Sequence, residues 1–284
     1  MTSARSLRAL SHDAREETIM PFTCLDHANV PARAGRGADV VHFDERLAFV
    51  LDATPGPQDL LDHPGGDAQW FALYLSARLI ERFSDSQQAI CSIHGALLDA
   101  QAEYRRLLGG RVDDAHSAPS ASLALAVATP THLELLRIGD AAIYRAGAFG
   151  EITACDHSRL IELEQRLGAS LRGCMDQESA LLRQMCAYRN IPQGYGVLSI
   201  GEAAMDYLEA EQLHARHVRE LLLCSRGFWA CFDPYDLARP GTALGAQAPR
   251  ARELLERAGL MTGETPPART PLHRDASLVR LRVH

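Results

Sequence analysis

Charged side chains stand at the ends of several predicted strands, where the strand core fixes them and the turn exposes them. Asp52 ends the apolar run 46–52, and Asp140 lies in a Gly-Asp turn after the run 131–138. Arg226 follows the run 221–225, and Arg274 precedes the run 277–283. Carboxylate oxygens bind hard divalent cations, and guanidinium groups bind phosphate through paired hydrogen bonds. These residue types indicate metal or phosphate chemistry at the strand ends.

The elements that must position these residues follow from hydrophobic periodicity. Apolar side chains at helical spacing predict helices over 68–83, 90–108, 158–168, 177–187 and 251–258. Apolar runs bounded by Gly, Pro or Asp predict strands at 46–52, 120–128, 131–138, 141–144, 197–200, 221–225 and 277–283. Because helices and strands are segregated rather than alternating, the order predicts an α+β fold.

Composition excludes several classes of function. The net charge of −7 argues against a nucleic-acid binder, which is usually basic. No apolar run approaches the roughly 18 residues that span a bilayer, so no membrane contact is expected. Seven cysteines without a CxxC pair favour a reduced, cytoplasmic setting. Residues 1–20 lack the apolar core of a signal peptide and are expected to form a loose tail or a short docked helix.

Four ordered segments carry a resemblance to a known family. The chain resembles the metal-dependent type 2C (PPM) Ser/Thr protein phosphatases, as a divergent bacterial-type member. The similar segments are Val50-Leu51-Asp52-Ala53-Thr54, the hairpin at 136–147, the strand exit Leu221 to Trp229, and Ala276-Ser277-Leu278-Val279 with the two residues before it. The segment 190–197 (NIPQGYGV) is also similar to a stretch found in some bacterial relatives.

The resemblance implies both a fold and a chemistry. The implied fold has two packed antiparallel sheets flanked by helices, and it would occupy 21–284 as a single phosphatase-like domain. The implied cofactors are two Mg²⁺ or Mn²⁺ ions, which activate a water molecule for attack on phosphoserine or phosphothreonine. Asp52 would be the catalytic, ion-bridging acid, Ala53 would offer its backbone carbonyl to a metal, and Asp140 would help hold a looser ion.

Other positions depart from the family pattern. The family's glutamate falls on Ala38, and its two remaining aspartates fall on Arg226 and Arg274. Asp39 replaces the glutamate only if the strand shifts by one residue, and Asp275 is expected to face away because neighbours on a strand point to opposite faces. A like-charge contact at about 4 Å costs about 4 kcal/mol at an effective dielectric near 20. Two arginines at ligand positions therefore predict a weakened metal site or none.

The resulting hypothesis is a pseudophosphatase, weak or inactive, that acts on or binds a phosphorylated protein or signalling partner. Asp52 would pair with Arg226 or Arg274, and Arg33, Arg226 and Arg274 would bind phosphate; Arg36 is an alternative to Arg33.

Three alternatives stay open. One is an active Mg²⁺- or Mn²⁺-dependent phosphatase with rearranged ligands, drawn from Asp39, Asp52, Asp140 and either Asp233 or Asp275. Another is a non-catalytic regulatory or scaffold module. The last is an unrelated α+β domain whose motif matches arise by chance.

Overall fold

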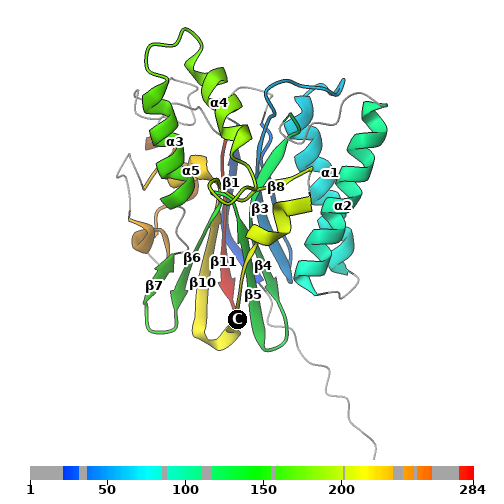
Figure 1. Cartoon of the computed structure of the whole chain (residues 1–284). Coiled ribbons are helices and arrows are strands. Elements are labelled where there is room, and N and C mark those ends of the chain that lie inside the picture. The colour runs from blue at the N-terminus through cyan, green and yellow to red at the C-terminus, as the bar shows by residue number, and fades with distance from the viewer. Residues whose placement is uncertain are drawn as a thin grey trace, which may run out of the picture.

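The computed structural model describes residues 22–31, 37–84, 88–109, 117–154, 158–200, 202–232, 239–245, 248–257 and 275–284. Two antiparallel sheets pack face to face, with helices outside them (Figure 1). This confirms the predicted α+β fold. The expected tail at 1–20 lies outside the described residues, as do Arg33, Arg36, Asp233 and Arg274.

One sheet contains, in spatial order, β1 (Phe22–Val30), β11 (Ala276–Val283), β10 (Val218–Cys224), β6 (Ala142–Gly147) and β7 (Ile152–Ala154). The other contains β2 (Val40–Phe43), β3 (Leu47–Thr54), β4 (Ser120–Ala128), β5 (His132–Ile138) and β9 (Glu209–His214), with β8 (Leu198–Ser199) paired to β4. Sequence analysis gave no bounds for β1, β2, β7 or β9. The strands β1, β2 and β9 mix polar and half-buried positions, and β7 has only three residues, so none forms the continuous apolar run that marks a buried strand.

Alternation along β3 divides its side chains between two apolar layers. Leu47, Phe49 and Leu51 pack against α1 (Gly66–Ser84) and α2 (Ala89–Leu108). Ala48 and Val50 face the other sheet and pack with residues of β10 and β11 in the layer between the sheets. Asp52 has the same parity as Ala48 and Val50. Its side chain therefore lies at one end of the inter-sheet layer.

The remaining helices complete the structure. The outer face of the first sheet is covered by α5 (Arg226–Trp229) and α6 (Ala251–Arg257), with the 3₁₀ turn η3 (Pro240–Ala243). Two further 3₁₀ turns lie at Glu202–Tyr207 and Ala215–His217. The helices α3 (Ser158–Ser170) and α4 (Gln177–Ala187) share a separate apolar cluster, and we call this pair the helical flap.

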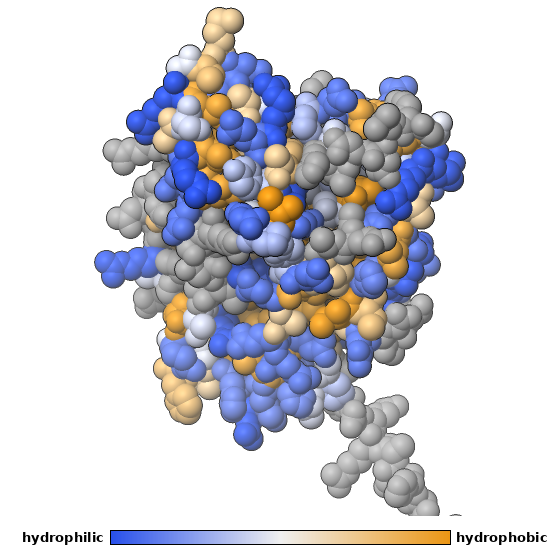
Figure 2. Space-filling model, in the orientation of Figure 1, coloured by the Kyte–Doolittle hydropathy of each residue, from blue (hydrophilic) through white to orange (hydrophobic). Residues whose placement is uncertain are grey.

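The face of the molecule shown in Figure 2 is mixed in hydropathy. Hydrophilic residues are spread over the face seen in Figure 2, and hydrophobic ones are interspersed among them. None of the helices in the described ranges is long and apolar enough to cross a membrane.

The start of α1 is fixed by a buried carboxylate. Asp67 is fully buried, and its oxygens accept hydrogen bonds from the amides of Leu60 and Leu61 and from the hydroxyl of Tyr104. This connects the loop after β3 to both helices. A buried carboxylate that accepts three hydrogen bonds contributes strongly to the stability of the fold, because its removal leaves three donors unsatisfied.

We predict that Asp67→Asn lowers the free energy of unfolding by about 2–4 kcal/mol and Tyr104→Phe by about 1 kcal/mol. Urea denaturation followed by circular dichroism measures both values. Asp62→Asn, at an exposed acid of the same loop, is the control and should change stability by less than about 0.5 kcal/mol. Equal losses of stability in Asp62→Asn and Asp67→Asn would contradict the conclusion that the buried Asp67 carboxylate fixes the start of α1.

Candidate functional site

Four strand ends meet at the same end of the inter-sheet layer. Asp39 precedes β2 and shares the parity of Val41, which packs into that layer. Asp52 lies near the end of β3, Ser225 follows β10, and Asp275 immediately precedes β11. These four positions bring together side chains that lie far apart in the sequence.

Backbone amides hold two of the three acids in place. Asp275 Oδ2 accepts hydrogen bonds from the amides of Ala38 at 2.5 Å and Asp39 at 3.3 Å. Asp52 Oδ2 accepts one from the amide of Arg226 at 3.2 Å. The expectation that the Asp275 side chain faces away from the other acids is wrong. Asp275 precedes the first residue of the strand, where strand alternation does not yet apply.

Asp39 is held differently. Its side chain is buried, and neither carboxylate oxygen has a hydrogen-bond partner among the described residues. The nearest hydroxyls are engaged elsewhere: Ser277 Oγ donates to Asn29 at 3.1 Å, and Ser225 Oγ accepts from the amide of Ser277 at 2.9 Å. In this segment it is therefore Asp39, the residue after Ala38, that places a buried carboxylate among the strand ends.

The environment raises the pKa of Asp39 well above its ordinary value. Burial is the largest cause, and the negative charges of Asp52 and Asp275 add to it. The nearby Ser277 and Ser225 side chains lower the pKa as hydrogen-bonding groups, and they act less than burial and the two charges; neither hydroxyl reaches Asp39 in full hydrogen-bond geometry. The strand ends thus create a pocket of negative charge in which one carboxyl favours its protonated form.

Arg226 lies at the mouth of this acid cluster. The sequence predicted only a strand exit here, but residues Arg226–Trp229 form the helical turn α5. The half-buried Arg226 places its guanidinium carbon 4.6 Å from the centre of the Trp229 ring, a distance typical of a cation–π contact. The backbone amide of Arg226 thus contacts Asp52, while its guanidinium stacks on Trp229.

Asp140 lies on the other side of Asp52 from this cluster. Asp52 pairs directly with Ser122 across β3 and β4, so both side chains lie on one face of the sheet. Ser122 Oγ donates to Asp140 Oδ1 at 2.7 Å and accepts from the Asp140 amide at 3.1 Å. Gly139 before it has φ 82°, a conformation that favours glycine. Ser122 thus lies beside Asp52 in the sheet and is hydrogen-bonded to Asp140. Sequence analysis missed Ser122, because a serine inside an apolar strand carries no distinctive pattern.

A two-metal centre does not fit these residues. The acid cluster offers the hard oxygen donors that Mg²⁺ and Mn²⁺ prefer. Within the described residues, however, no group of three or more His, Cys, Asp or Glu side chains is placed to hold a metal ion. Ala38 carries no carboxylate, and Arg226 carries the opposite charge. Ala53 is buried at the end of β3, where its carbonyl alone cannot replace the missing ligands.

Solved structures share this fold. The Mycobacterium tuberculosis serine/threonine phosphatase PstP/Ppp superposes with a TM-score of 0.57 at 14% identity, over 94% of this chain and all of that one. PppA, a key regulatory component of T6SS in Pseudomonas aeruginosa, gives 0.56 at 15%, over 94% and 99% of the two chains. Staphylococcus aureus Stp1 gives 0.56 at 10%, over 94% and 96%.

One structure of the PstP catalytic domain, with a TM-score of 0.56 at 15% identity over 93% of this chain and 98% of that one, is a complex with two manganese ions. No family model matches the sequence, and no curated protein matches it. The superposition over nearly the whole chain, despite identities of only 10–15%, shows that the protein has the fold of the PPM phosphatases.

The raised pKa of Asp39 predicts a pH-dependent stability. Between the pKa of the unfolded chain and the higher pKa of the fold, the folded state holds the extra proton. Stability therefore falls as pH rises through this window, and the destabilisation is complete above it. Asp39→Asn removes the charge, so we expect it to raise the melting temperature at neutral pH and to flatten this part of the pH profile.

We expect the free energy of unfolding to rise by about 1–3 kcal/mol. In a domain of this size, each kcal/mol raises the melting temperature by about 2–4 °C. Calorimetric melting from pH 4 to 8 measures the effect, with the exposed Asp206→Asn as control. A lower melting temperature in Asp39→Asn at neutral pH would show that the Asp39 carboxylate is stabilising.

Proposed function

We propose that this protein is a pseudophosphatase that binds proteins carrying phosphoserine or phosphothreonine in a phosphatase-like cleft. Hydrolysis by the metal-dependent route is weak or absent. The observation that carries the proposal is Arg226. It supplies a fixed positive charge at a strand exit where the related pattern needs a metal-binding aspartate, and its amide already occupies an oxygen of Asp52.

The electrostatics support binding without a metal pair. A cation close to Arg226 is repelled, whereas a phosphate is attracted to it. Arg33 and Arg274 are proposed to add further phosphate contacts, and Asp52 is proposed to orient the Arg226 turn rather than activate water. Asp140 would keep Ser122 and the β4 strand end in register with Asp52. The surface around this cleft would recognise the protein partner.

A second candidate function rests on Asp39. Two buried carboxylate oxygens without a donor are costly unless a proton or a cation compensates them. As placed here, the three acids do not form a metal-binding group. If Asp52 and Asp275 moved toward Asp39, a single divalent ion would provide that compensation and would make the protein a phosphatase with rearranged ligands. Mn²⁺ would then raise the melting temperature of the wild type but not of Asp39→Asn.

The proposed function predicts selective binding without turnover. Fluorescence anisotropy should show that a phosphothreonine peptide binds more tightly than its unphosphorylated form, and that Arg226→Ala weakens only the phosphorylated complex. With Mn²⁺ present, phosphate release should stay at the background level. Mn²⁺-dependent release that disappears in Asp52→Asn would overturn the pseudophosphatase.

Restoring the acid gives a converse prediction. Arg226→Asp should make the protein responsive to Mn²⁺, because it replaces a repelling charge with an oxygen ligand. At a Mn²⁺ concentration 100 times the dissociation constant, binding stabilises the fold by about 2.7 kcal/mol. Differential scanning calorimetry measures the shift. Arg219→Asp makes the same charge change at an exposed position of β10, and it should give no Mn²⁺ response.

A further inference from the structure

The segment after α4 contains a fixed turn that the proposed function does not use. Asn190 has φ 52°, a left-handed conformation that asparagine tolerates better than most residues. A Cβ atom on Gly194 would lie 1.7 Å from the carbonyl oxygen of Tyr188, so only glycine fits. The Asn190 side chain accepts from the amide of Val197 and donates to Ser199 Oγ, both at 2.8 Å. This turn therefore has one well-defined conformation.

Arg189 projects from this turn into the sandwich. It is 5% exposed, and its guanidinium donates to Ala118 O at 2.8 Å and to Pro55 O at 3.1 Å. Pro55 follows β3 three residues after Asp52, and Ala118 precedes β4 four residues before Ser122. One planar group thus fastens the ends of the two strands that carry the site, a geometry that the single ammonium of lysine cannot reproduce.

The two fastened segments also press against each other. A Cβ atom on Gly56 would lie 1.9 Å from the carbonyl oxygen of Ser117, so the backbones touch where Arg189 holds them. The helical flap has its own apolar cluster, which Tyr188 and Tyr195 join from the turn. Tyr195 also donates to Met185 O at 3.2 Å. The turn is therefore continuous with the flap on one side and with the strand ends on the other.

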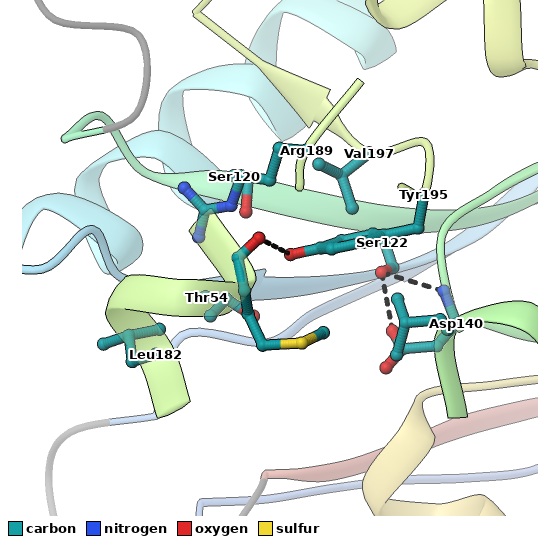
Figure 3. Close-up of a pocket in the computed structure, with 10 residues that line it drawn as sticks. Thr54, Ser120, Ser122, Asp140, Leu182, Arg189, Tyr195 and Val197 are labelled. Atoms are coloured by element: carbon teal, nitrogen blue, oxygen red, sulfur yellow. Dashed lines mark hydrogen bonds between the residues drawn. The ribbon is translucent and has the colours of Figure 1, made fainter. Parts of the chain in front are cut away.

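A small pocket lies between the turn and the site. Its volume is about 40 Å³, enough for a few water molecules. Figure 3 shows Arg189 and Asp140 on opposite sides of it, with Ser120, Ser122 and Tyr195 between them. Arg189 Nε is buried and has no hydrogen-bond partner among the described residues.

We infer that Arg189 is a positioning residue that latches the helical flap to the ends of β3 and β4, and so sets the placement of Asp52 and Ser122. The latch rests on the geometry of Arg189 alone. Its consequence for phosphopeptide binding rests on the proposed function. Movement of the flap would be transmitted to the acid-bearing strand ends through this guanidinium group, and to β4 also through its pairing with β8.

Hydrogen exchange measured by mass spectrometry tests the latch without any ligand. Arg189→Lys should accelerate exchange in peptides covering 53–61 and 117–121 by about tenfold, while peptides from β10 and β11 stay unchanged. Arg183→Lys, on the exposed face of α4, should leave all of these peptides unchanged. Unaltered exchange at the strand ends in Arg189→Lys would overturn the inference, as would an equal increase throughout the protein.

Binding of the phosphothreonine peptide then tests the consequence for the site. We expect Arg189→Lys to weaken it at least fivefold, and more than Asp67→Asn, which destabilises the fold from the α1 side. Equal effects of the two substitutions would reduce Arg189 to a general stabilising residue. If the wild type does not bind the peptide, the proposed function fails, while the exchange experiment still decides whether the latch exists.

Discussion

The candidate site depends on the convergence of three carboxylates at one end of the layer between the sheets. Asp275 and Asp52 are stabilised there by backbone amides, whereas Asp39 has buried oxygens without a donor. Like charges in such an environment raise one another's pKa and favour a proton, a cation or a positively charged side chain nearby. Arg226 is the positively charged residue at the mouth of this cluster. The site is therefore a cluster of acids at strand ends with an arginine in the adjoining turn.

Rigidity around the acids comes from the strand ends. Ser122, the strand partner of Asp52, is hydrogen-bonded to Asp140, and Arg189 fastens the segments that follow β3 and precede β4. Both contacts are made by buried polar groups, which are effective in positioning because they lose hydrogen bonds if they move. The helical flap reaches the sandwich through the same turn. The helical flap and the strand ends are thus joined by a few polar contacts.

Much of the fold could be predicted from the sequence because its central strands are long apolar runs. The runs that became β4, β10 and β11 were recognisable, and so were the amphipathic helices α1 and α2. The edge strands β1 and β9 were not, because their half-exposed pattern depends on neighbours that only the fold supplies. The same limit applied to the site. Asp52 and Arg226 were found from strand exits, whereas the inward placement of Asp39 and Asp275 required the register of β2 and the first residue of β11.

We propose that Arg226 and Ala38, at two positions where related proteins carry acids, leave the fold without a two-metal centre. Anomalous diffraction from crystals of the wild-type protein soaked in MnCl₂ tests this proposal most directly, because each bound Mn²⁺ is then located by its own scattering. We predict no pair of ions bridged by Asp52. Two Mn²⁺ ions about 4 Å apart on the Asp52 carboxylate, as in two-metal hydrolases, would contradict it.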